Sequence, residues 1–261
     1  MRLSAKGVTA LGRVALLLLA AASLLAEPAA SSAQTRTETP SYTRLNTFGF
    51  FVSYANDSSH ILLGEAANRK LLYLGVSYDR RLILNRTMNW QYEAELMPVA
   101  LESDPIQIVI TNGTLYGMGA PITFTERTGE PSVGPCVATS GTINIPGFES
   151  ITYAGTCHRR WTIGQAMAPV GLRWNFRPQR RLQPFLDGHG GFMYSTQPIP
   201  VTDAGSFNFL FDAGAGLELF RSKTRSVRVE YRYHHISNGN TAPSNPGIDN
   251  GLFQVTWAFG H

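Results

Sequence analysis

The fold is indicated most clearly by a stretch that reads VRVEYRY over residues 227–233. Apolar or aromatic residues alternate strictly with charged ones along it. Successive side chains of a β-strand point to opposite faces, so this period of two is typical of a strand. One face of the strand is therefore apolar, and the other is fully charged.

The same alternation recurs through the rest of the chain. Seven further segments show it, and together they predict eight β-strands, each with one apolar column and one polar column. The segments cover approximately residues 46–54, 71–80, 88–97, 168–176, 184–195, 207–219, 227–233 and 253–259.

Patterning alone is compatible with a soluble β-sandwich and with a membrane barrel, but three observations favour the barrel. The strands are close to the ten residues that a tilted membrane strand needs. Aromatic residues lie near the ends of the apolar columns, as expected at membrane interfaces. Short basic turns alternate with longer loops. We therefore expect an all-β fold: an eight-stranded antiparallel transmembrane β-barrel with long external loops, in the cell outer membrane.

The charged columns are expected to point into the barrel. A barrel of eight strands is narrow, and side chains fill its interior. A catalytic carboxylate pair is an alternative interpretation of these charges, but we favour an ion-paired lumen. Its expected members are Glu93, Glu95, Arg173, Asp187, Asp212, Glu218, Arg228, Glu230 and Arg232.

The N-terminus resembles a secretory signal peptide over residues 1–33. Arg2, Lys6 and Arg13 precede an apolar run at 14–26, and small residues end at Ala33. Residues 34–261 then form a single barrel domain, in which no apolar run is long enough for a helical span. The net charge of the whole chain is only +4, and its basic residues do not form an aromatic-interleaved patch, so nucleic-acid binding is not expected.

The longest connection, residues 98–167, is expected to be an external loop or a hairpin extension, and it has no functional interpretation. It contains Cys136 and Cys157, the two cysteines of the chain. Export to an oxidising compartment favours a disulfide between them. A metal or thiol-enzyme site is the alternative, but it would need further ligands at fixed spacing.

One segment breaks the strand pattern. The apolar column that ends at Tyr233 continues with His235 and Ser237, which places a polar pair on the lipid-facing wall. Polar groups there cost free energy unless they are satisfied, so such a pair suggests a functional site. By the same alternation, His234 points into the lumen.

His235 and Ser237 lie two residues apart, about 6.6 Å between Cα atoms, which an imidazole can bridge. They could form a base and a nucleophile. Asp249, at the start of the last strand, faces outward and could orient the imidazole, because the last two strands pair antiparallel. Alternatively, the strand simply ends at Tyr233, and the polar residues form a loop rim.

The segment from Tyr231 to Thr241, YRYHHISNGNT, is followed by NPGID at residues 245–249. Together they resemble the lipid A 3-O-deacylase family of the PagL type. His235, Ser237 and Asn238 match the family motif His-x-Ser-Asn without gaps. An acidic residue follows in both, but it is Asp249 here and Glu in the family. The chain is also longer, mainly through residues 98–167, and ends Phe-Gly-His rather than on an aromatic residue.

The resemblance implies an outer-membrane esterase that removes the 3-position acyl chain from lipid A of lipopolysaccharide. It implies Ser237 as nucleophile, His235 as general base and acid, and Asp249 as the residue that orients His235. Asn238, with the backbone N–H of Gly239 or Asn240, would stabilise the oxyanion, and Asn245 matches a family asparagine.

The resemblance implies no metal or cofactor, and lipid A in the outer leaflet as the partner. The alternatives are a non-enzymatic barrel with a structural or adhesive role, and another outer-membrane lipid esterase or acyltransferase. The sequence leaves open whether the chain forms a homodimer.

Overall fold

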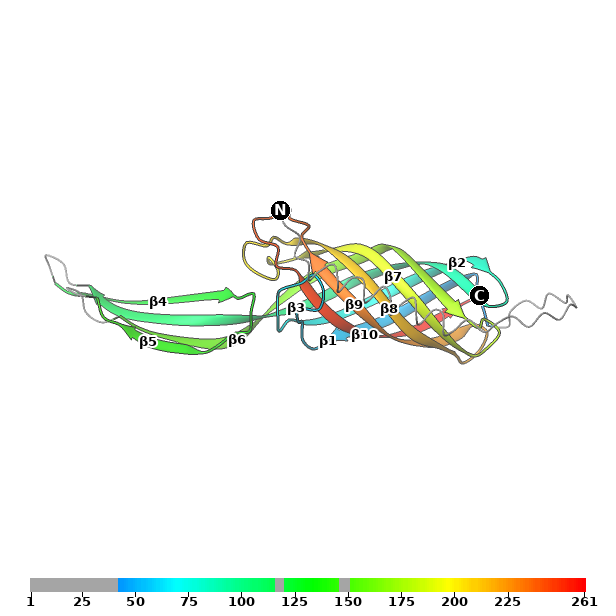
Figure 1. Cartoon of the computed structure of the whole chain (residues 1–261), viewed down its shortest axis with the longest axis horizontal. Coiled ribbons are helices and arrows are strands. Elements are labelled where there is room, and N and C mark those ends of the chain that lie inside the picture. Colours follow the sequence, from blue (N-terminus) through cyan, green and yellow to red (C-terminus); the bar gives the residue numbers. More distant parts are fainter. Residues whose placement is uncertain (1–41, 116–119, 146–150) are drawn as a thin grey trace, which may run out of the picture.

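The computed structural model describes residues 42–115, 120–145 and 151–261, so the expected signal peptide at 1–33 lies outside the described residues. The described chain contains ten β-strands (Figure 1). They are β1 (Asn46–Ala55), β2 (Lys70–Leu84), β3 (Met88–Leu115), β4 (Ile122–Pro131), β5 (Thr139–Ile143), β6 (Ile151–Phe176), β7 (Leu182–Ser195), β8 (Phe207–Phe220), β9 (Arg225–Ser237) and β10 (Ile248–Gly260).

Eight of the strands form a closed antiparallel ring in the order β1-β2-β3-β6-β7-β8-β9-β10. Pairing of β1 with β10 closes the ring, and pairing of β3 with β6 bypasses the long connection between them. The predicted eight-stranded β-barrel is therefore confirmed. Within the three described ranges, no helix is both long and apolar enough to cross a membrane.

The wall of the barrel is apolar outside and charged inside. Phe50, Tyr231 and Trp257 on the outer face are each more than 60% exposed, whereas Arg228 and Arg232 of the inner face are at most 2% exposed. All nine predicted lumen charges are buried. They are ion-paired, as expected: for example, Arg228 contacts Asp79 at 2.7 Å and Arg232 contacts Glu95 at 2.9 Å.

The outer parts of β3 and β6 continue as a paired ribbon beyond one end of the barrel (Figure 1). Strands β4 and β5 flank this ribbon and give a four-stranded extension in the order β4-β3-β6-β5. Because most of residues 98–167 belong to this sheet, the segment is a hairpin extension rather than an irregular loop.

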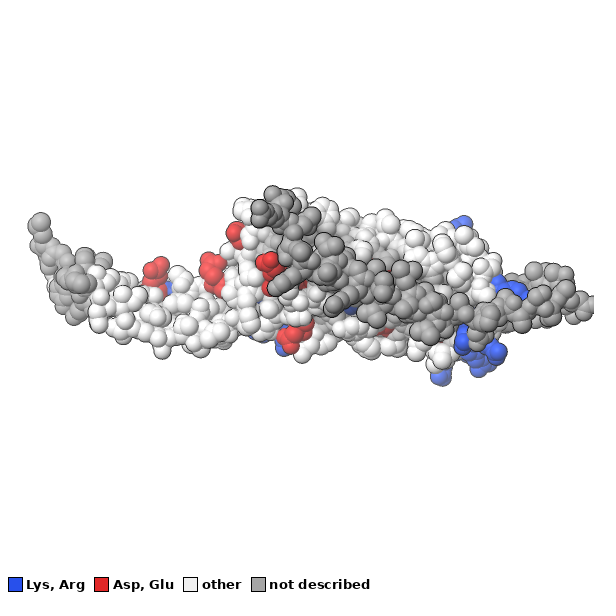
Figure 2. Space-filling view, in the orientation of Figure 1, with Lys and Arg blue, Asp and Glu red and all other residues white. Residues whose placement is uncertain are grey.

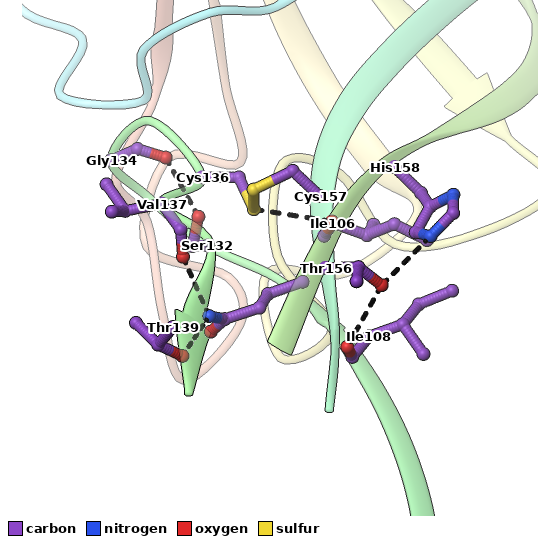
Figure 3. The surroundings of a disulfide bond; sticks show 11 residues. Ile106, Ile108, Ser132, Gly134, Cys136, Val137, Thr139, Thr156, Cys157 and His158 are labelled. Atoms are coloured by element: carbon purple, nitrogen blue, oxygen red, sulfur yellow. Dashed lines mark hydrogen bonds between the residues drawn. A yellow bond between two sulfur atoms is a disulfide. The ribbon is translucent and has the colours of Figure 1, made fainter. Parts of the chain in front are cut away.

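A disulfide bond holds the base of the extension together (Figure 3). Cys136, in the segment between β4 and β5, is bonded to Cys157 on β6, with an S–S distance of 2.10 Å. Beside it, the Gln107 side chain on β3 donates to the carbonyl of Val137 at 2.8 Å. The segment between β4 and β5 is thus fixed to both central strands.

Arg69 joins this same segment to the barrel. Its guanidinium is fully buried and donates to the carbonyls of Ser132 at 2.5 Å and Val133 at 2.9 Å. It also donates to Ala67 O at 2.5 Å and pairs with Asp104 at 3.2 Å. Arg69 is the last residue of the loop between β1 and β2. This loop also covers the candidate site.

Candidate active site

The end of β9 carries His235 and Ser237 on the outer column of the wall, as the alternation predicted. His235 lies opposite Phe211 of β8, which is 52% exposed, and opposite Asp249 of β10. His234 points the other way and contacts Asp212 and the Tyr73 hydroxyl inside the lumen. The two adjacent histidines therefore have separate environments.

His235 and Asp249 form a close pair across β9 and β10. The imidazole Nδ1 lies 2.6 Å from Asp249 Oδ1. In a neutral imidazole, a proton on Nδ1 would donate to this carboxylate and leave Nε2 with a lone pair, the tautomer that a general base requires. A carboxylate so placed also stabilises the imidazolium that forms when the base takes a proton.

Three further donors fix the Asp249 carboxylate, and sequence reasoning did not identify them. The Tyr233 hydroxyl donates to Oδ1 at 2.8 Å, and the backbone N–H groups of Leu62 and Leu63 donate to Oδ2 at 2.6 and 2.8 Å. The Tyr233 ring also stacks on the His235 ring, with an interplanar angle of 10°. For Tyr233 a signal existed, since it precedes His235 by two residues on the same face.

The loop between β1 and β2 covers the pair from outside. Glu65 N donates to Pro246 O at 2.6 Å, and Ala66 N donates to Gly247 O at 3.0 Å. Under this cover Asp249 is fully buried and His235 is only 9% exposed. The sequence predicted an imidazole in contact with lipid tails; the structure corrects this, because the loop shields the imidazole and the acid.

A glycine allows the loop to approach this closely. A Cβ added at Gly64 would lie 2.5 Å from the backbone N of Asp249 and 3.0 Å from its Cγ. Only a residue without a side chain fits there, so Gly64 sets the distance between the loop and the acid.

Ser237 is the last residue of β9 and is half-buried. In the described part of the chain, no hydrogen bond joins its hydroxyl to the imidazole, whose bonded partner is Asp249. Nucleophile–base contacts are often long or poorly aligned without substrate and tighten in the complex. Ser237, His235 and Asp249 therefore share one face, with the contact between His235 and Asp249 formed and none between Ser237 and His235.

The Asn238 side chain holds the turn after Ser237 in place. Its amide nitrogen donates to the carbonyls of Ala204 and Ser244, and its oxygen accepts from the backbone N–H of Asn240 at 2.9 Å. An amide nitrogen has two protons, so neither is available to an oxyanion in this conformation. The oxyanion role predicted for Asn238 and for the Asn240 N–H is not supported by these contacts.

Two predicted members of the oxyanion set remain. Gly239, two residues after Ser237, has a left-handed conformation with φ of 63°, which glycine adopts without steric cost. Asn245 accepts from the backbone N–H of Asn238 at 3.0 Å and donates to Asn240 Oδ1 at 3.3 Å. The Gly239 backbone N–H and the second amide proton of Asn245 therefore stay as predicted donors.

An aromatic surface adjoins the serine on the outer wall. Phe209 of β8 lies opposite Ser237 and is 47% exposed. The Phe207 ring packs against it at 5.3 Å between centroids, and Phe192 stacks on Phe207 at 5.9 Å. The outer wall beside Ser237 is therefore an exposed aromatic surface.

A second cluster of titratable groups lies inside the lumen. Glu93, Glu95 and His189 could bring ligand atoms within 4.8 Å of one another. However, Arg173 and Arg228 pair with Glu93, and Arg232 pairs with Glu95. Guanidinium groups already occupy these carboxylates, so the cluster is an ion-paired part of the core rather than a metal centre.

The family model described as "Lipid A 3-O-deacylase (PagL)" matches residues 132–258, which include His235, Ser237 and Asp249 but not the loop between β1 and β2. The expected resemblance is thereby confirmed, and with the closed ring it places the chain among outer-membrane β-barrels. No curated protein sequence is significantly similar to the chain.

Several solved structures are similar to the chain. The crystal structure of the outer membrane enzyme PagL has 14% identity and a TM-score of 0.45, covering 82% of this chain and 99% of its own. Neisserial surface protein A has 11% identity and a TM-score of 0.40, with coverages of 83% and 97%. OprG from Pseudomonas aeruginosa has 8% identity and a TM-score of 0.39, with coverages of 86% and 100%.

Proposed function

We propose, from the match of residues 132–258 to the lipid A 3-O-deacylase family, that this chain is an outer-membrane esterase acting on lipopolysaccharide. It removes the ester-linked acyl chain at the 3-position of lipid A by a Ser-His-Asp mechanism. The observation that carries the proposal is the His235–Asp249 contact of 2.6 Å on the outer column that Ser237 shares.

In this mechanism the Ser237 hydroxyl attacks the ester carbonyl while His235 Nε2 accepts its proton. The imidazolium then gives the proton to the departing sugar oxygen, which leaves an acyl group on Ser237. A water molecule, deprotonated by the same nitrogen, then attacks this acyl-enzyme. The bond between the acyl carbon and Ser237 Oγ breaks, the imidazolium returns its proton to Oγ, and the fatty acid leaves. Asp249 keeps the imidazole oriented and stabilises its charge throughout.

Negative charge develops on the carbonyl oxygen during both attacks. The Gly239 backbone N–H is the donor we assign to it, with Asn245 as a second candidate. Loss of one such donor typically costs about 2.7–4 kcal/mol of transition-state stabilisation. Asn238 acts as a positioning residue, because its hydrogen bonds to Ala204, Ser244 and Asn240 shape the turn that presents Gly239.

The position of the site suits a lipid substrate. Ser237 lies at the end of the barrel opposite to the short turns, and outer-membrane barrels have their short turns on the periplasmic side. That end is level with the outer leaflet, which lipid A occupies. The exposed Phe209 and Phe207 side chains offer the acyl chain an apolar path to the serine.

The test is mass spectrometry of lipid A from cells that express the chain, Ser237→Ala or Ser140→Ala. Ser140 is an exposed serine of the extension and serves as a matched control. We expect wild type and the control to remove one 3-hydroxyacyl group and Ser237→Ala to remove none. Folding is checked by the mobility shift of barrels on heating in detergent.

Other outcomes would contradict the proposal. An unchanged lipid A spectrum with folded wild type would indicate a non-enzymatic barrel. Release of acyl groups from phospholipids, or their transfer to a second lipid, would indicate a different lipid esterase or an acyltransferase. Deacylation by folded Ser237→Ala would exclude the serine mechanism.

A further inference from the structure

The end of the barrel that carries both described termini is strongly basic. Leu45 N bonds to the carbonyl of the last residue, His261, at 2.7 Å, so the ends of the described chain meet there. Three short turns, β2–β3, β6–β7 and β8–β9, lie at the same end. These turns and the strand residues next to them carry nine cations, all exposed except the half-buried Arg81: Arg80, Arg81, Arg86, Arg177, Arg180, Arg181, Arg221, Lys223 and Arg225. We call these nine residues the basic ring.

The acidic residues that the structure describes at this end of the barrel are buried. Among the described residues at this end, the acids are Asp79 and Glu218, each 1% exposed and paired with arginine in the lumen. Figure 2 shows Lys and Arg gathered at this end of the visible face, and Asp and Glu toward the extension. The visible acidic residues thus lie away from the basic ring.

An exposed apolar belt directly adjoins the basic ring. Leu182 follows Arg181 directly and Leu219 precedes Arg221 by two residues, each on the barrel side of its turn, and they are 51% and 44% exposed. Such a belt marks the hydrocarbon of the bilayer, and the next layer outward is that of the lipid headgroups. Because short turns face the periplasm, the basic ring lies at the headgroups of the inner leaflet.

We propose that the basic ring binds the phosphate groups of anionic phospholipids in the inner leaflet. Guanidinium groups donate in pairs to phosphate oxygens, and eight of the nine cations are arginines. A cation near an anionic surface typically contributes about 1 kcal/mol, or roughly a five-fold preference for an anionic lipid over a neutral one.

This interaction would set the height of the barrel in the membrane, a consequence that rests on the proposed function. Strand β9 runs from Arg225 in the basic ring to Ser237 at the site. Its twelve steps of about 3.4 Å, at a tilt of about 40°, span roughly 30 Å along the membrane normal. Holding Arg225 at the inner phosphates therefore holds Ser237 near the outer leaflet.

The test measures the lipid selectivity of the purified, folded full chain. The chain is reconstituted in phosphatidylcholine vesicles with spin-labelled phosphatidylglycerol or spin-labelled phosphatidylcholine, and the relative association of the two labels is compared at low and high salt. We expect the anionic lipid to associate several-fold more strongly at low salt. High salt should bring the ratio toward one, because it screens exposed charges.

Two double variants locate the interaction. R180Q/K223Q removes one cation from each of two turns and should reduce the preference at least two-fold. K70Q/R127Q removes two cations from the other half of the molecule and should leave it unchanged. No preference in wild type, or a loss with K70Q/R127Q alone, would overturn the proposal.

The proposal would also be overturned if R180Q/K223Q kept the full preference for the anionic lipid. It would likewise be overturned if the protein bound purified peptidoglycan through the basic ring and showed no lipid preference. The experiment measures lipid association, so its result does not depend on deacylase activity. All variants are also compared in the S237A background, in which the proposed nucleophile is absent.

Discussion

Replacing Gly64 by alanine tests whether the loop between β1 and β2 controls the site. The residue is buried, and it is not among the glycines with positive φ, so an alanine backbone is allowed there. Its new Cβ would lie 2.5 Å from Asp249 N and 2.7 Å from Ile248 C. Both are backbone atoms of β10, which the sheet holds in place, so the loop has to move.

The size of the movement follows from these distances. Ordinary contact begins at 3.4 Å, so the loop must retreat by about 0.9 Å. The Leu62 and Leu63 N–H bonds to Asp249, now 2.6 and 2.8 Å, would then exceed the limit of about 3.2 Å for a good hydrogen bond. A misplacement of about 1 Å in a catalytic assembly can cost roughly 100-fold in rate, and we expect a loss of that order.

The assay is ester hydrolysis by purified protein, with lipid A profiles from cells as a second readout. Gly134→Ala is the matched control, because a Cβ at Gly134 meets no atom within 4 Å. We expect full activity for the control and an intact heat-modifiable barrel for both variants. Folded Gly64→Ala with activity within about three-fold of wild type would refute the control of Asp249 by the loop.

Of three further predictions, two concern the candidate site and one concerns the extension. Tyr233→Phe keeps the ring stacked on His235 but removes the 2.8 Å bond to Asp249; we expect about a ten-fold lower kcat, with KM nearly unchanged, from the loss of one charge-assisted hydrogen bond. Asp249→Glu adds a methylene to a fully buried group and should lower activity at least ten-fold despite keeping the acid, as single-turnover rates would show. Cys136→Ser/Cys157→Ser opens a link across 21 residues and should destabilise the extension by about 3 kcal/mol, read as faster proteolysis there while the barrel stays heat-modifiable.

The residues on β9 and β10 were predictable because the period of a strand is exact. Alternation alone assigned His235 to the outside and His234 to the lumen, and antiparallel pairing brought Asp249 opposite His235. The bonds from Leu62 and Leu63 were not predictable. They come from an aperiodic loop 187 and 186 residues away from Asp249, and backbone donors carry no side-chain signature.

The turn after Ser237 is a second place where contacts with a distant loop could not be predicted from the sequence. The resemblance implied that Asn238 stabilises the oxyanion, whereas its amide nitrogen donates to two backbone carbonyls in the structure. Its amide partners include the carbonyl of Ala204, 34 residues earlier, in a segment with no periodic pattern. The alternation of residues along the sequence predicted the strands. Contacts between loops, which have no such pattern, determine which hydrogen-bond donors near Ser237 are already occupied.

The loop also explains how a carboxylate can work on the outer wall of a membrane barrel. An ionised group that faces hydrocarbon is costly unless its lone pairs accept hydrogen bonds. Asp249 receives four contacts, from His235, Tyr233, Leu62 and Leu63, and two of these come from the loop. The loop reaches the carboxylate because Gly64 has no side chain and because the acid is an aspartate, which stays close to the backbone of β10. The shorter acid and the close loop are therefore two parts of one arrangement, and changing either residue alone should cost activity.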